Sequence, residues 1–148
     1  MKSLDTNILL YGTNADCPEF TWANPVLERM RAEPGQWIIS DQVFLEYYAL
    51  IRSPRVLTQP LDPLAASRQV EALREEVGCL HCGYSVDSWQ EIRHWLGNPE
   101  FPARRVFDLV LAVTLRDHGV KIFFTRNVKD FEPFGFFEVV NPEGSPLA

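Results

Sequence analysis

Hydrophobic and polar residues are arranged in two patterns along this chain of 148 residues. Short apolar runs between turn-forming residues are typical of buried strands, and apolar residues spaced three or four apart are typical of amphipathic helices. We expect strands in an apolar run that ends near Asp5 and at 37–39, 121–125 and 137–140. We expect helices directly after Asp5 and at 24–32, 41–52, 63–78, 89–97 and 104–118.

Helix boundaries are predicted from residues that satisfy the free N–H and C=O groups of a helix end. Asn24 followed by Pro25 predicts a cap and a first helical residue, and Asp62 followed by Pro63 predicts the same. Ser40 or Asp41 is expected to cap the helix that continues to about Arg52. The sequence Ser-Trp-Gln-Glu at 88–91 matches a capping box.

Short apolar strands that alternate with amphipathic helices predict an α/β layer fold with a parallel sheet. Ligands of such sheets bind at the carboxyl ends of the strands. Asp5 follows the first strand and Thr125 ends a later one, so both are expected at the same edge.

Composition fits a single globular domain, residues 1–148, with 141–148 expected to form a loose tail. Hydrophobic residues make up 46% of the chain and charged residues 23%, and no apolar run approaches the ~20 residues that span a bilayer. No secretory signal is expected at Met1, and three cysteines, an odd number, indicate a reducing cytoplasm. The net charge of −6 does not favour a nucleic-acid partner, unless several carboxylates bind cations.

Glu46 and Asp108 lie on helix faces that are otherwise apolar. Burying a lone carboxylate costs several kcal/mol, so each is expected to be paired, protonated or bound to a cation. Pairing with a buried Arg or Tyr is the alternative for Glu46, and a satisfied core acid or a helix start is the alternative for Asp108. The alternative role for Asp5 is to cap a helix, and the alternative role for Asp130 is to cap a turn.

Together these carboxylates predict a metal site. Two like charges ~4 Å apart repel by roughly 4 kcal/mol at an effective dielectric of 20, which a divalent cation relieves. Oxygen-only ligands select Mg²⁺ or Mn²⁺ over Zn²⁺. One ion or two would suit phosphoryl transfer.

The spacing of these motifs resembles the PIN-domain family, and within it the VapC-type toxins of prokaryotic toxin–antitoxin pairs. The resemblance spans nearly the whole chain. The motifs that carry it are Asp5-Thr6-Asn7, Glu46, Arg52-Ser53-Pro54-Arg55-Val56, Phe107-Asp108-Leu109, Asp117-His118-Gly119 and Thr125-Arg126-Asn127-Val128-Lys129-Asp130-Phe131.

The resemblance implies a Rossmann-like α/β/α sandwich and a divalent-metal ribonuclease. Asp5 and Asp108 would be the principal metal ligands, with Glu46 as a further ligand or a water-orienting acid. Many relatives have an acid where this chain has Asn127, whereas others have the Asn-x-x-Asp-Phe form, which favours Asp130 as an outer acid acting through water. The polar supports of the site would be Thr6, Asn7, Thr125 and Asn127.

Four basic residues close to these motifs are candidates for positioning the RNA backbone, or else solvated charges. They are Arg104, Arg105, Arg126 and Lys129. The resemblance also implies an RNA substrate, a cognate antitoxin and a homodimer. No membrane association is expected.

Two other functions compete. A phosphatase of the haloacid-dehalogenase type would use Asp5 as a nucleophile but needs a second acid where this chain has Asn7. A PIN-like module that binds RNA or a partner without cleaving it remains open because of Asn127. Cys79 and Cys82 form half of a zinc site or a redox pair, or are small buried residues.

Overall fold

The computed structural model describes residues 1–76 and 78–145. Its five strands are parallel and form two hydrogen-bonded sets, β2-β3 and β1-β4-β5. A bridge between Lys2 and Trp37 joins the two sets, so the order across the sheet is β3-β2-β1-β4-β5. The strands are β1 (Lys2–Leu4), β2 (Ile38–Ser40), β3 (Leu80–Cys82), β4 (Ile122–Phe124) and β5 (Glu138–Val140). The predicted parallel α/β sheet is confirmed.

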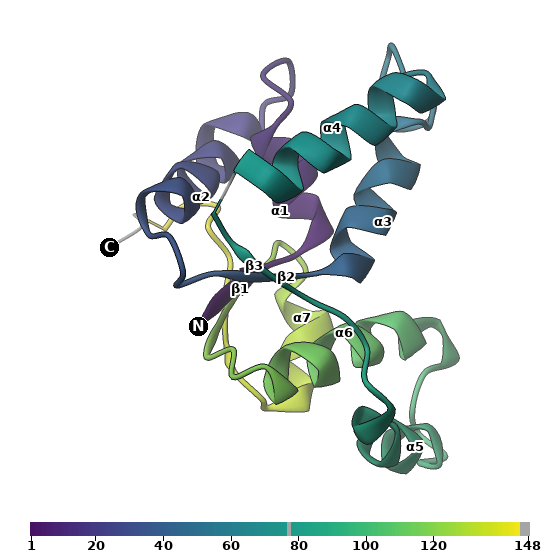
Figure 1. The fold of residues 1–148 in the computed structure, drawn as a ribbon. Helices are drawn as coiled ribbons and strands as arrows, with labels where there is room; N and C mark the ends of the chain where they lie inside the picture. Colours follow the sequence, from purple (N-terminus) through teal and green to yellow (C-terminus); the bar gives the residue numbers. More distant parts are fainter. Residues whose placement is uncertain (77, 146–148) are drawn as a thin grey trace.

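Helices cover both faces of the sheet, which makes the fold an α/β/α sandwich (Figure 1). One layer holds α1 (Thr6–Gly12), α2 (Phe20–Ala32), α3 (Asp41–Ile51) and α4 (Pro63–Glu76). The other holds α5 (Trp89–Leu96), α6 (Val106–Asp117) and α7 (Val128–Phe131). All of β2 is buried, as expected for a parallel strand covered on both faces. None of the helices in the described residues is long and apolar enough to cross a membrane.

The predicted start of the second helix at Asn24 and Pro25 is wrong, because α2 begins at Phe20 and contains Pro25. The extra turn packs closely on α1, where a Cβ added to Gly12 would lie 3.2 Å from the carbonyl oxygen of Ala23. Asn24 supports the same contact by donating from Nδ2 to the carbonyl of Gly12 at 3.0 Å. Tertiary packing therefore outweighs the backbone hydrogen bond that Pro25 cannot donate.

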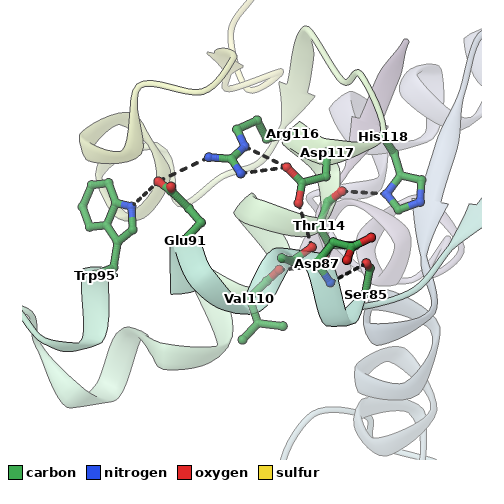
Figure 2. Close-up of polar contacts among 10 residues, drawn as sticks. Ser85, Asp87, Glu91, Trp95, Val110, Thr114, Arg116, Asp117 and His118 are labelled. Atoms are coloured by element: carbon green, nitrogen blue, oxygen red, sulfur yellow. Dashed lines mark hydrogen bonds and ion pairs between the residues drawn. The ribbon is translucent and has the colours of Figure 1, made fainter. Parts of the chain in front are cut away.

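Most predicted helix starts are observed, but the capping box at Ser88 does not form. Ser40 caps α3, and its hydroxyl accepts from Gln42 N at 3.2 Å. Ser88 instead donates its hydroxyl to Asp117 at 2.7 Å and leaves the start of α5 without a side-chain cap. Figure 2 shows the resulting network, in which Arg116 lies between Glu91 and Asp117.

The network in Figure 2 ties α5 to α6. Arg116 lies 3.3 Å from Glu91 and 2.7 Å from Asp117, and Trp95 donates its indole N–H to Glu91 at 3.0 Å. Arg116 also covers the ring of Phe136 at 4.8 Å. Asp117, which also accepts from Ser88, thus helps to hold the second helical layer together.

Strand β3 was not expected from the sequence. It is an edge strand next to β2, and its Leu80 and His81 are exposed. Its hydrophobic pattern is therefore too weak to stand out. In the predicted tail, residues 141–145 contain a turn, in which the backbone N–H of Ser145 donates to the carbonyl oxygen of Pro142 at 3.3 Å. Residues 146–148 of that tail lie outside the described residues.

Candidate active site

Asp5 lies where β1 ends and α1 begins. Its backbone N–H donates to the carbonyl of Phe124 at 2.9 Å, which holds it at the carboxyl edge of the sheet beside β4. Its Oδ1 accepts from the backbone N–H of Thr6 at 2.8 Å, so the helix-cap role considered from the sequence is real. Only 7% of the residue is exposed. A cap alone does not explain such deep burial of a carboxylate.

The second oxygen of Asp5 is held by two polar side chains. Thr125, directly after β4, donates its hydroxyl to Oδ2 at 2.7 Å, and Asn7 donates from Nδ2 at 2.9 Å. Asn7 also lies 3.3 Å from the hydroxyl of Thr125. Three of roughly four acceptor positions of the carboxylate are thus used, and one is left for a further partner.

Glu46 and Asp108 reach the same edge from α3 and α6. The Thr6 hydroxyl donates to Oε2 of Glu46 at 2.7 Å, so Asp5 and Glu46 are joined through Thr6, whose backbone N–H binds Asp5. Gln42 donates from Nε2 to Oε1 of Glu46 at 3.0 Å. Asp108 is half-buried in the first turn of α6. The alternative of Glu46 paired with a buried Arg or Tyr is not observed among the described residues.

Burial and neighbouring acids raise the pKa of Asp5 and of Asp108. Burial raises the pKa of Asp5 to about 6, hydrogen bonds from Thr125 and Thr6 oppose this, and Glu46 and Asp108 add to it by charge repulsion. Burial also raises the pKa of Asp108, with repulsion from Asp130 and Glu46. The carboxylates are therefore close enough to interact, and a cation would relieve their repulsion.

Asp130 is committed to an ion pair with Arg105, whose guanidinium also donates to the carbonyl of Lys129 at 2.7 Å. Asp130 nevertheless contributes to the raised pKa of Asp108, which places it at the margin of the cluster. Asn127 takes part through its backbone, whose N–H donates to the Thr125 hydroxyl at 2.9 Å. Its exposed side chain makes no hydrogen bond within the described residues.

The four basic candidates divide into two pairs. Arg105 is held by Asp130, and Arg126 lies 3.4 Å from Glu19 and 3.3 Å from Glu143. Arg104 and Lys129 are exposed and form no ion pair within the part of the chain that the structure describes. Among the described residues, the charges of this second pair are therefore not neutralised by a neighbouring acid.

The donor set fits a hard divalent cation, because every ionisable side chain in it is a carboxylate. Among the described residues, no three His, Cys, Asp or Glu side chains are already gathered at ligand spacing. The carboxylates would therefore have to draw together around an ion.

Cys79 and Cys82 are free, buried thiols, and burial raises the pKa of each. These properties match small core residues rather than metal ligands or a redox pair.

No protein-family model matches the chain. Ribonuclease VapC24 of Mycobacterium tuberculosis is 37% identical over 142 residues, which cover 96% of this chain and 97% of VapC24. Ribonuclease VapC48 of the same organism is 25% identical over 142 residues, covering 95% of this chain and 97% of VapC48. The chain belongs to the VapC family of ribonucleases.

Solved structures agree on the fold. VapC20 of Mycobacterium tuberculosis, described as a toxin that cleaves the sarcin-ricin loop, superposes with a TM-score of 0.68 at 18% identity, covering 95% of this chain and 100% of that one. At this identity the likeness speaks for the fold alone. It confirms the Rossmann-like sandwich that the resemblance to PIN domains implied.

Proposed function

We propose that this chain, acting as one domain, is a Mg²⁺- or Mn²⁺-dependent ribonuclease that hydrolyses phosphodiester bonds and serves as the toxin of a VapBC-like pair. The observation that carries the proposal is the gathering of Asp5, Glu46 and Asp108 at one sheet edge, where burial and repulsion from neighbouring acids raise the pKa of Asp5 and Asp108. Family membership supports the activity on RNA.

In this proposal Asp5 and Asp108 hold the ion, and Glu46 is a further ligand or orients water. A divalent ion held there would supply Lewis-acid activation of water and neutralisation of charge at the scissile phosphate. Thr125 and Asn7 keep the Asp5 carboxylate in one orientation through their bonds to Oδ2. Asp130 acts as an outer acid, and the products would be a 5′ phosphate and a 3′ hydroxyl.

Arg104 and Lys129 are the basic residues that we propose to contact the RNA backbone. Both are exposed and free of ion pairs within the described residues, and Arg104 acts on the pKa of Asp108. Arg105 and Arg126 would take part only after leaving their acidic partners.

The decisive experiment incubates purified protein with total RNA in Mg²⁺, in Mn²⁺ and in EDTA. We expect cleavage with either ion and none in EDTA, and at least a hundredfold loss in Asp5→Asn and Asp108→Asn. Asp16→Asn removes an exposed acid outside the cluster and should cut like the wild type. Equal cleavage by all three variants would show that the site is wrong.

The same preparations separate the two alternatives. A module that only binds RNA would retain RNA in a filter-binding assay but leave it intact at every ion concentration. A phosphatase would hydrolyse p-nitrophenyl phosphate and form a covalent aspartyl phosphate, whereas we expect neither.

We also propose a protein antitoxin and a homodimer as partners. VapBC2 of Rickettsia felis, solved with a DNA fragment from its promoter, has the same fold, with a TM-score of 0.65 at 17% identity over 95% of this chain and 97% of that one. The surface of this chain carries large exposed apolar side chains suited to protein contacts, among them Leu45, Val86 and Phe107. Light scattering should give twice the mass of the chain, and co-expression of the antitoxin should relieve growth inhibition.

A further inference from the structure

Gln42, in the first turn of α3, connects two acid-bearing helices. Its Nε2 donates to Oε1 of Glu46 at 3.0 Å and to the carbonyl oxygen of Phe107 at 3.0 Å. Phe107 directly precedes Asp108 in α6. Within the described residues, this is the only hydrogen bond that joins α3 to α6.

These bonds complete a continuous path from Asp5 through Glu46 to the backbone beside Asp108. Asp5 accepts from the backbone N–H of Thr6, whose hydroxyl donates to Oε2 of Glu46, while Gln42 donates to Oε1. Glu46 is thus held from two sides by neutral donors. The path then continues through Gln42 to the backbone of α6.

A neutral donor has an advantage over a cation at this position. A lysine or arginine at position 42 would pair with Glu46 and repel a divalent ion. The amide restrains the carboxylate and leaves its negative charge available.

We propose that Gln42 is a positioning residue that ties Glu46 to the backbone beside Asp108, so that the two carboxylates draw together in a fixed orientation around a divalent cation. This inference rests on the proposed function of the same site. It assigns to Gln42 the role of an outer partner that orients ligands, and the loss of such partners typically lowers metal affinity or activity about 10–100-fold.

The test compares Gln42→Met, which keeps the size of the side chain but removes both donors, with Gln90→Met as a matched control. Gln90 is the second residue of α5 as Gln42 is of α3, and it is exposed. Titration calorimetry gives the Kd for Mn²⁺, and a fluorescent oligoribonucleotide gives kcat and KM. We expect Gln42→Met to raise the Kd for Mn²⁺ at least about tenfold and to lower kcat, with KM for RNA within about twofold of wild type. Gln90→Met should change none of these.

Unfolding curves separate positioning from a structural role. If Gln42→Met is less stable but, while folded, binds Mn²⁺ with the wild-type Kd and cleaves with the wild-type kcat, the inference is overturned and the ribonuclease proposal stands. Should Gln42→Met fail to fold, Gln42→Asn replaces it, because its shorter amide cannot span both acceptors and should raise the Kd by an intermediate factor. A wild-type protein that neither binds Mn²⁺ nor cleaves RNA would overturn both proposals.

Discussion

The raised pKa of Asp5 makes a quantitative prediction about folding stability. Burial raises this pKa from its ordinary value of 3.8 to about 6, so the folded protein holds the Asp5 proton more tightly than the unfolded chain does. The stability that this proton contributes is complete below pH 3.8 and is lost as the pH rises through about 6. The difference between the two pKa values corresponds to about 3 kcal/mol of unfolding free energy.

Asp5→Asn removes the charge and nearly preserves the shape. The carbonyl of Asn can still accept from Thr6 N–H, but the amide loses bonding with Asn7 or Thr125, at a cost of about 1 kcal/mol. Without metal, the variant should therefore be about 1 kcal/mol less stable than the wild type at the acid end and about 2 kcal/mol more stable at pH 7.5.

Urea unfolding in metal-stripped buffers at several pH values from 4 to 7.5 measures this difference directly. Groups outside the acid cluster titrate alike in both proteins, so their contributions cancel when one curve is subtracted from the other. If the difference in unfolding free energy between the two proteins does not change across this range, or favours the wild type at neutral pH, Asp5 is not a buried carboxylate of raised pKa.

Three further predictions concern the metal, helix packing and the α5–α6 network. Mn²⁺ at about a hundred times its Kd should stabilise the wild type by about 2.7 kcal/mol and leave Asp108→Asn nearly unchanged in thermal scans; equal shifts would exclude Asp108 as a ligand. Gly12→Ala should cost about 1–3 kcal/mol in urea unfolding, because the new Cβ would lie 2.6 Å from Cδ1 of Leu27, and an unchanged midpoint would contradict this packing. Ser88→Ala should cost about 1–3 kcal/mol by the same measurement, since Asp117 loses a donor, and a neutral result would mean that water replaces the hydroxyl without loss.

Sequence patterns predicted the sheet and the convergence of Asp5 and Thr125, because residues at the ends of parallel strands share an edge whatever the details of packing. The apolar surroundings of Glu46 and Asp108 likewise marked them as unusual acids. These inferences depend on local periodicity and on one topological rule, so they survive errors of a few residues in helix boundaries.

What could not be predicted depends on contacts between distant segments. The start of α2 is decided by its packing on Gly12, which the local signal at Pro25 does not contain. Ser88 gives its hydroxyl to a residue 29 positions away instead of capping its own helix. Gln42 shows no signal in the sequence, because a glutamine in a first helical turn is ordinary until the carbonyl of Phe107 is placed beside it.

The hydrogen bond between Asp5 and Thr125 joins residues that are 120 positions apart. During synthesis at about 5–20 residues per second, Asp5 therefore leaves the ribosome's active centre roughly 6–24 s before Thr125 is added. Until β4 has been made, Asp5 lacks both its neighbour in the sheet and the donor that orients its carboxylate. A nascent chain is thus an incomplete nuclease for most of its own translation, and the ribosome producing it works beside an enzyme that is not yet assembled.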